Sequence, residues 1–413
     1  MDAKDGSADE RELDLVVWGA TGFTGRLVAE YLGRRTAAAG SDVAGLRWAL
    51  GGRDADRLRA VADELGLDVP VVTGDALDPA SMGALAARTR AVVTTVGPYA
   101  RYGDALVDAC VAAGTHCCDL TGEVPWLRGV IDRHHAAARE RGVRIVSMCG
   151  YDSVPSDLGC LVLQEAVHAA TGAYAARVDC LAGPSKGGVS GGTIASAALM
   201  MERRKDPAVR RWLTDPGALT PGHRPPVRPD PFDVARIAGE WAAPWVMAGI
   251  NGRVVHRTHQ LLGHPWGEGF TYAERYPLGR GPVGWTLAHG LRLATLCFAG
   301  WLAFAPSRAL LRRVLLPDPG EGPSEASRAA GRFRHRLWAA DADGTPLGRL
   351  TIHADLDPGY VATAAMLAEC GLATLAADGA GPAGVLTPGM AFGTDLVPRL
   401  EGFGMAFDVE LAS

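Results

Sequence analysis

Three glycines spaced three residues apart form the part of this sequence whose residue types most clearly suit a chemical role. Gly19, Gly22 and Gly25 follow a short apolar run and precede residues 26–32, which have the periodicity of a helix. A strand, a tight glycine turn and a helix in this order place the free N–H groups of a helix N-terminus where they can bind a pyrophosphate. Gly19 would allow the sharp turn, Gly22 the close approach of a phosphate, and Gly25 the packing of helix on strand. An ordinary glycine-rich turn is the alternative.

Residues at the ends of three later apolar runs extend this expected cofactor site. The second run, residues 46–52, ends before Arg53, the third at Asp75, and the fourth at Val96. Such positions gather at the carboxyl edge of a parallel sheet, where folds of this kind bind ligands. The expected cofactor-binding residues are Gly19, Thr21, Gly22, Phe23, Thr24, Gly25, Arg53, Asp75, Ala76, Val96, Gly97 and Pro98.

The residue that follows the second run bears on the choice between the two nicotinamide cofactors. A site that prefers NAD places an acid there to bind the ribose 2′-hydroxyl. This sequence has Arg53, whose guanidinium suits a 2′-phosphate, although the neighbouring Asp54 keeps NAD open. Arginine is also common here, since only three of the 41 basic residues are lysines. We expect NADP(H), with NAD(H) as the alternative.

One of those three lysines, Lys186, stands in a stretch rich in glycine and hydroxyl groups, residues 186–193, before an expected helix over 193–203. A compact ammonium group can polarise a carbonyl or donate a proton, which a guanidinium cannot do. We therefore expect Lys186 to be catalytic; contact with a phosphate is the alternative role.

Two tyrosines follow expected strands and could also supply a proton. Tyr99 follows the fourth run and Tyr151 the sixth, and packing is the alternative role for each. The expected catalytic residues are thus Lys186, Tyr99 and Tyr151. Tyr102 and Ser153 are further hydroxyl donors, whereas Asp119 and Glu123 are expected to hold loop geometry.

A metal site is not expected. His256, His259 and His264 lie near Glu268 and resemble a ligand cluster, but hydrogen bonding explains them better. The eight cysteines include no C-x-x-C pair, and several lie in apolar runs, so we expect reduced thiols in the core.

The elements that would position these residues alternate regularly in the first third of the chain. Strands alternating with amphipathic helices predict a parallel sheet with right-handed crossovers. The expected strands are residues 15–18, 46–52, 69–75, 91–96, 115–120 and 143–148, and the helices between the later strands are 54–65, 79–88, 103–113 and 126–141.

The alternation stops after Gly150, which indicates a second architecture. A helix over 157–169, capped by Ser156 or Asp157, precedes a strand over 176–182. Residues 333–338 and 347–356 alternate like two antiparallel strands, and a helix over 360–376 follows. The fold class is therefore α/β: a Rossmann-like parallel sheet plus an α+β substrate domain with a mainly antiparallel sheet.

The expected domains follow from these patterns and from composition. Residues 1–13 form an acidic, disordered lead that does not resemble a signal peptide. Residues 14–152 form the dinucleotide-binding domain and 153–413 the substrate domain, which carries a tryptophan-rich apolar insert at about 212–316. We expect the C-terminal helices to pack back on the first domain. With 413 residues, 48% hydrophobic residues and a net charge of −5, the chain is globular and no nucleic-acid partner is expected.

The uncharged run of residues 293–305 is the one segment that suggests contact with a membrane. As a helix it would span about 20 Å, short of the roughly 30 Å hydrocarbon core of a bilayer. A buried or dimer-forming helix is the first interpretation. We also expect a homo-oligomer. The alternative is a helix on the inner face of the plasma membrane, with Arg292, Arg308, Arg312 and Arg313 toward anionic headgroups. We expect a cytoplasmic protein.

Several longer motifs resemble one family over nearly the whole chain, from about residue 13 to 411. They are G-A-T-G-F-T-G (19–25), T-T-V-G-P-Y-A-R-Y-G (94–103), D-L-T-G-E (119–123), C-G-Y-D-S-V-P-S-D-L-G (149–159), K-G-G-V-S-G-G-T (186–193), and the late D-P-G-Y and G-V-L-T-P stretches. The sequence resembles the saccharopine-dehydrogenase-like oxidoreductases, and within them the trans-acting enoyl reductases of polyketide-derived lipid synthesis. The match to saccharopine dehydrogenases proper is mainly the cofactor domain, so lysine metabolism is not implied.

The resemblance implies an NADPH-dependent reductase of an enoyl thioester or a related lipid or polyketide intermediate, in glycolipid or polyketide lipid biosynthesis. The substrate would be lipid-like and presented by a carrier protein or by coenzyme A. Hydride would reach the β-carbon, the enolate oxygen would need donors, and a proton would reach the α-carbon. Two alternatives stay open: a saccharopine-type imine or carbonyl reductase, and a non-catalytic NADP-binding protein associated with a membrane.

Overall fold

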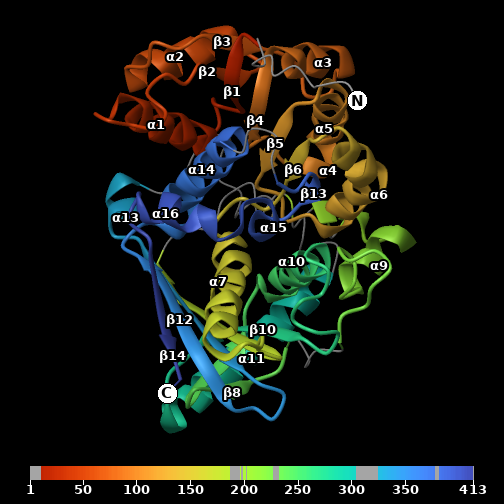
Figure 1. Cartoon of the computed structure of the whole chain (residues 1–413), viewed down its shortest axis with the longest axis vertical. Helices are drawn as coiled ribbons and strands as arrows, with labels where there is room; N and C mark the ends of the chain where they lie inside the picture. Colours follow the sequence, from red (N-terminus) through yellow and green to blue (C-terminus); the bar gives the residue numbers. More distant parts are fainter. Residues whose placement is uncertain are drawn as a thin grey trace.

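The computed structural model describes residues 11–186, 196, 199–200, 202–226, 232–303, 324–376 and 381–412. The acidic lead before residue 11 and most of the expected glycine-rich loop and helix over 187–203 lie outside the described residues. Two seven-stranded sheets organise the described part, and α7 (Val154–Thr171) runs between them (Figure 1).

Sheet A is parallel throughout, with strand order β13-β6-β5-β4-β1-β2-β3. Helices cover both of its faces, which explains why a strand such as β1 is apolar and fully buried along its length. The strands are β1 (Leu13–Trp18), β2 (Trp48–Gly52), β3 (Val71–Thr73), β4 (Thr89–Thr94), β5 (His116–Asp119), β6 (Arg144–Val146) and β13 (Gly384–Leu386). The helices between the first six are α1 (Phe23–Ala37), α2 (Ala55–Leu65), α3 (Pro79–Arg88), α4 (Tyr99–Tyr102), α5 (Asp104–Ala113) and α6 (Val124–Glu140).

The seventh strand of sheet A, β13, comes from the far end of the chain. Its three residues pair in parallel with β6 at the edge of the sheet. The sequence predicted six strands. It missed β13 because this strand lies outside the alternation of strands and helices that revealed the equally short β3 and β6.

Sheet B confirms the second half of the predicted fold class. Its order is β14-β12-β11-β7-β10-β9-β8, and β7 and β10 are its one parallel pair. The strands are β7 (Arg177–Lys186), β8 (Ala235–Ile237), β9 (Glu240–Pro244), β10 (Thr271–Pro277), β11 (Arg332–Ala340), β12 (Pro346–Ala354) and β14 (Ala406–Leu411). The tryptophan-rich region is therefore no simple insert: it supplies three strands, together with α10 (Ala248–Leu261) and α11 (Gly281–Ala303).

The C-terminal helices pack on sheet A. In Figure 1, α14 (Thr363–Ala376) lies beside α1 and across β4. Glu369 of α14 is fully buried, accepts a hydrogen bond from Tyr31 of α1, and pairs with Arg35 of α1 at 3.1 Å and Arg399 of α16 (Leu396–Glu401) at 3.2 Å. Among the described residues, one helical stretch, Pro358–Ala376, is long and apolar enough to cross a membrane, but 72% of its most apolar window is buried. It is a core helix.

The start of α7 corrects one prediction. The helix begins at Val154, three residues earlier than expected, so neither Ser156 nor Asp157 caps it. Both are buried in its first turn, where Ser156 Oγ donates to Glu274 and Asp157 accepts from Thr258. These polar side chains fasten α7 to sheet B and α10 and do not close a helix end.

Candidate cofactor and active site

The turn after β1 has the geometry that its three glycines predict. Gly19 has a positive φ of 95°, a conformation that residues with a Cβ rarely adopt, and Gly22 N–H donates to its carbonyl oxygen at 2.9 Å. A Cβ at Gly25 would stand 2.1 Å from the same oxygen. The packing of α1 on the turn therefore requires glycine at 19 and at 25.

Gly22 differs from its two neighbours because the protein itself does not require a glycine there. Its φ is −78°, and an added Cβ would meet only the Gly19 carbonyl, at 3.3 Å. Gly22 occupies the N-cap of α1, and no side chain caps this helix, whereas Asp54 and Asp78 cap α2 and α3. The N–H groups of the first turn of α1 are thus available to an anion, which fits a cofactor pyrophosphate.

The residues that follow β4 lie against the glycine turn. We call the glycine turn (residues 19–25) and the residues that follow β4 (95–98) the cofactor cradle. A Cβ on Gly19 would lie 2.7 Å from Val96 Cγ2 and 2.8 Å from Thr95 Oγ1, so the β1 turn and the β4 exit are in direct contact. The structure therefore brings Val96, and with it Gly97 and Pro98, beside the glycine turn. Thr95, which the sequence interpretation omitted, belongs to the cofactor cradle.

The surroundings of Arg53 favour a cofactor with a 2′-phosphate. Arg53 is exposed directly after β2, and within the described chain it forms no ion pair. The adjacent carboxylate of Asp54 accepts from Asp56 N and Arg57 N as the cap of α2. Since that acid already caps α2, the guanidinium of Arg53 is the charged group that remains available at the end of β2.

The remaining expected cofactor contacts lie around this cradle. Asp75 follows β3, and its carboxylate accepts from Leu77 N, while Ala76 is buried beside it. Thr21 is exposed and Thr24 half-buried in the turn. Phe23 points to the C-terminal part of the chain, where its ring meets that of Tyr360 with centroids 4.7 Å apart. The D-P-G-Y motif therefore lies against the start of α1.

Tyr99 follows β4, and its side chain holds neighbouring segments of main chain together through hydrogen bonds. Its hydroxyl donates to Thr94 O and accepts from Leu120 N, both at 3.1 Å, and its side chain is buried. Burial raises its pKa well above the ordinary value. Because both sides of the hydroxyl are used inside the protein, this geometry favours a positioning role over proton donation.

The two acids expected to hold loop geometry are placed to do so. Glu123 accepts from Tyr99 N at 2.8 Å and Ala100 N at 2.9 Å, which ties the start of α6 to α4. Asp119, at the end of β5, accepts from Thr121 N, Ser147 Oγ and Met148 N, and burial raises its pKa to about 6.

Tyr151 lies where the carboxyl edge of sheet A meets sheet B. It follows β6, its N–H donates to Thr363 Oγ1 of α14, and its ring packs against Phe333 of β11. Its hydroxyl lies 3.1 Å from Nε2 of His335, which is buried on β11. Burial raises the pKa of Tyr151 and lowers that of His335 to about 4, so the pair is a protonated phenol and a neutral imidazole at physiological pH.

Lys186, the third expected catalytic residue, points elsewhere. Ser185 pairs with Phe333 and contributes a hydrogen bond to the Tyr151 hydroxyl, whereas Lys186 pairs with the exposed Arg332. Successive side chains of a strand point to opposite faces, so Lys186 lies on the face of sheet B away from Ser185. The structure brings together Tyr151, Ser185 and His335, and it does not bring Lys186 to them.

A cluster of buried polar side chains lies next to Tyr151 in the sequence and extends to α10 and β10. Ser153, which follows Tyr151 by two residues, donates to Asn251 of α10, and Asn251 donates to Glu274 of β10. Cys180, Glu274 and His335 place possible ligand atoms within 4.8 Å of one another. Hydrogen bonding accounts for Glu274, which accepts from Ser156, Asn251 and Tyr272. Nδ1 of His335 is buried and has no hydrogen-bond partner among the described residues.

The histidine cluster noted in the sequence forms an aromatic stack. His259 lies parallel to Trp266 with centroids 4.9 Å apart, and its Nε2 is 3.0 Å from Gly267 O. Burial lowers the pKa of His259 to about 4. Hydrogen bonding, the role that the sequence analysis favoured, is accompanied by packing of His259 on Trp266.

Asp152 is a group that sequence reasoning missed. It follows Tyr151, retains exposed surface, and yet the protein around it raises its pKa to about 6. Desolvation by the surrounding protein is the cause of this rise in pKa. The place of Asp152 beside an aromatic residue in the 149–159 motif was the available signal.

Comparisons with known proteins agree with this geometry. Residues 15–146 match the family model described as the saccharopine dehydrogenase NADP binding domain. A Mycobacterium tuberculosis protein named as a candidate trans-acting enoyl reductase is 41% identical over 97% of this chain and 98% of its own, and the trans-acting enoyl reductase of Mycobacterium bovis is 38% identical over the same shares. The fold resembles the saccharopine dehydrogenase (L-Glu forming) of Saccharomyces cerevisiae, with TM-score 0.50, 13% identity, and coverage of 97% and 100% of the two chains.

Proposed function

This chain belongs to the family of trans-acting enoyl reductases, and from that premise we propose that it reduces the carbon–carbon double bond of a lipid-like or polyketide enoyl thioester. It is an NADP-dependent oxidoreductase with a Rossmann-like domain. The observation that carries the proposal is that an uncapped α1 N-terminus and Tyr151 both follow strands of sheet A, and so lie at its carboxyl edge.

The residues present fit NADPH, which supplies the hydride when bound. We propose that the first turn of α1 binds the pyrophosphate, that Arg53 binds the 2′-phosphate, and that Asp75 and Ala76 border the adenine. The β4 exit at Val96 then borders the nicotinamide end, on the side of sheet A that faces Tyr151.

Tyr151 is the proposed source of the hydrogen bond to the developing enolate. We propose that the imidazole, with its proton on Nε2, and Ser185 both donate to the phenol oxygen, which leaves the phenol hydrogen free to point at a substrate. The raised pKa keeps Tyr151 protonated, so it can stabilise the oxyanion or deliver the proton. Lys186 is better placed for contact with a phosphate or a carrier than for this step.

The exposed face of α11 supports a lipid-facing role. Val283, Leu293, Phe298 and Trp301 are all exposed on this helix, far more apolar surface than a single helix usually offers to water. Residues 275–317 contain six arginines and no acid, in a chain whose net charge is −5. Because this charge complements anionic headgroups, we propose that α11 contacts a membrane surface.

The test of this contact is sedimentation with vesicles of mixed neutral and anionic phospholipid. Leu293→Ser with Phe298→Ser should abolish binding, whereas Leu77→Ser, an exposed leucine on the other domain, should not. If the protein ignores vesicles and the double variant instead turns a dimer into a monomer in light scattering, the face is an interface between two copies.

The proposed activity is tested by following NADPH absorbance with and without an enoyl thioester. Oxidation should require the thioester, and NADPH should be preferred over NADH. Gly22→Val should weaken NADPH binding at least about tenfold, since it blocks charged-group hydrogen bonds at the turn. Gly83→Val is the control, because a Cβ there meets nothing within 4 Å. Oxidation with imines or ketones only would contradict the proposal.

A further inference from the structure

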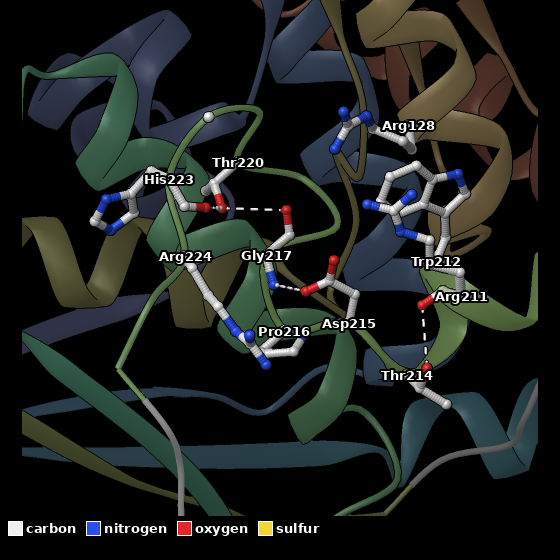
Figure 2. Close-up of a pocket in the computed structure, with 11 residues that line it drawn as sticks. Arg128, Arg211, Trp212, Thr214, Asp215, Pro216, Gly217, Thr220, His223 and Arg224 are labelled. Carbon is white, nitrogen blue, oxygen red and sulfur yellow. Dashed lines mark hydrogen bonds between the residues drawn. The ribbon is translucent and has the colours of Figure 1, made fainter. Parts of the chain in front are cut away.

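A hollow in the protein surface lies between α6, α9 (Pro207–Thr214) and the loop that follows α9. Its volume is about 590 Å³. Figure 2 shows Arg128 and Trp212 on one side of it, His223 and Arg224 on the other, and the loop through Asp215 and Gly217 between them. We call it the arginine hollow, because Arg128, Arg211 and Arg224 line it.

The charge of the arginine hollow is strongly positive. Asp215 is the one acid among its lining residues, and its carboxylate already accepts from Gly217 N at 2.9 Å. Arg253 and Arg257 of α10 lie close by: Arg253 donates to Asp215 O, and burial together with the charge of Arg128 lowers the pKa of Arg257 to about 10. Such mutual repulsion would be relieved by a bound anion.

Two of the guanidinium groups are available to a ligand. Arg128 is partly occupied, since it pairs with Asp132 at 2.8 Å. Arg211 and Arg224 are exposed and form no ion pair with any described residue, and Arg211 lies 4.6 Å from the centre of the Trp212 ring. Exposed guanidinium groups beside an aromatic face suit a phosphate ester with an organic tail.

Two helices, α6 and α10, connect the arginine hollow with the proposed active centre. Glu123 accepts a hydrogen bond from Tyr99 N at the start of α6. Arg128 lies five residues further along the same helix, a distance of about 7.5 Å along its axis. On the other side, α10 carries both Asn251, which is bonded to Ser153 near Tyr151, and Arg253, which holds the loop of the hollow.

From these observations we propose that the arginine hollow binds the phosphate of the 4′-phosphopantetheine arm on which the acyl thioester is presented. The inference rests on the proposed function, since it names how that substrate is held. A carrier protein and coenzyme A share this arm, so the phosphate is the common chemistry. The long flexible arm would let the thioester reach the centre near Tyr151 while its phosphate stays in the hollow.

The test compares one enoyl chain on three supports: a holo-carrier protein, coenzyme A, and N-acetylcysteamine, which has no phosphate. Arg211→Gln with Arg224→Gln should lower kcat/KM for the two phosphate-bearing substrates at least about tenfold, as expected for lost hydrogen bonds to a charged group. It should leave the N-acetylcysteamine thioester and the Kd of NADPH unchanged. Arg210→Gln, on the same helix but outside the hollow, is the matched control.

A binding measurement separates failure of the pocket from failure of the function. We expect free 4′-phosphopantetheine, but not pantetheine, to raise the Tm of the wild-type protein and not of the double variant. If this holds while no thioester is reduced, the proposed reaction is wrong and the anion site stands. If thioesters are reduced but the double variant loses equally on all three supports, or not at all, the arginine hollow is not the phosphate site. Loss with coenzyme A alone would assign it to a coenzyme A phosphate other than that of the shared arm, and overturn the proposal.

Discussion

Single residues decide the chemistry, and the decision depends on which of their atoms are free. Tyr99 and Tyr151 both follow strands of sheet A, and the sequence did not separate them. The structure does: the Tyr99 hydroxyl is bonded on both sides to main chain, whereas the Tyr151 hydroxyl meets a neutral imidazole. His335 could not be foreseen, because it lies 184 residues further along the chain and no local pattern connects the two.

Replacing each tyrosine with phenylalanine tests this difference. Tyr151→Phe should lower turnover by about 10² to 10⁴, the usual contribution of a positioned acid, and leave the Kd of NADPH unchanged. Tyr99→Phe should instead destabilise the protein by about 1–3 kcal/mol, because Thr94 O and Leu120 N lose their partner. Steady-state rates and denaturant titrations measure the two effects. An exchange of these phenotypes would refute the assignment.

Arg53 is predicted to set the cofactor preference. Arg53→Ala should raise the KM for NADPH about tenfold and leave that for NADH nearly unchanged, since only NADPH carries the 2′-phosphate. The exposed Arg59 on α2 offers a control, because it is paired with Asp56. Equal losses for both cofactors would place Arg53 elsewhere than at the ribose.

His335 gives the protein a pH dependence with a definite sign. Its folded pKa is about 4, against 6.5 for the ordinary group, so folding favours the neutral ring. The stability that this provides is complete above pH 6.5 and is lost as pH falls toward 4, by at most about 3 kcal/mol. Between pH 7 and 4.5, the wild-type protein should therefore lose more unfolding free energy than His335→Asn. Parallel losses in the two proteins would exclude a buried neutral imidazole.

At the scale of elements, the cofactor cradle depends on a helix that the C-terminal segment holds in place. α1 follows the glycine turn, and it is held against α14 and α16 through buried Glu369, which contacts Arg35, Arg399 and Tyr31. Glu369→Ala should cost about 2–3 kcal/mol, because the Tyr31 hydroxyl loses its partner, and Arg35 and Arg399 keep only the exposed Asp42. Asp56→Ala, which breaks the exposed pair with Arg59, should cost less than about 1 kcal/mol. Chemical denaturation compares them, and similar small costs would mean that α14 does not anchor α1.

The elements also show what the sequence can and cannot predict. Apolar or periodic runs in the sequence predict the first six strands and the helices between them, and they also predict β11 and β12. Other strands outside the alternation with helices were missed: β13 and β8 have three residues each, and β9 and β10 lie in a stretch whose tryptophans suggested an apolar insert. The cap of α7 was misplaced because Ser156 and Asp157 serve tertiary contacts, which no local rule detects.

For the whole molecule, the proposed active centre is formed by two sheets built from interleaved parts of the chain. The glycine turn, Arg53 and the β4 exit come from consecutive units of sheet A, so their convergence at its carboxyl edge was predictable from the alternation of strands and helices. Ser185 and His335 come from sheet B, and α14 returns to sheet A from beyond it. Contacts between distant segments therefore complete the site, and these follow only from the fold.

The central claim, hydride transfer to the β-carbon of an enoyl thioester held between the two sheets, is tested most directly by isotope transfer. The purified protein would be given NADPH deuterated at C4 and an enoyl thioester, and the product analysed by mass spectrometry and NMR. We predict one deuterium per product molecule, on the β-carbon, with the α-hydrogen taken from solvent and the signal lost in Gly22→Val. A saturated product without deuterium, or deuterium on a carbonyl carbon, would contradict the account.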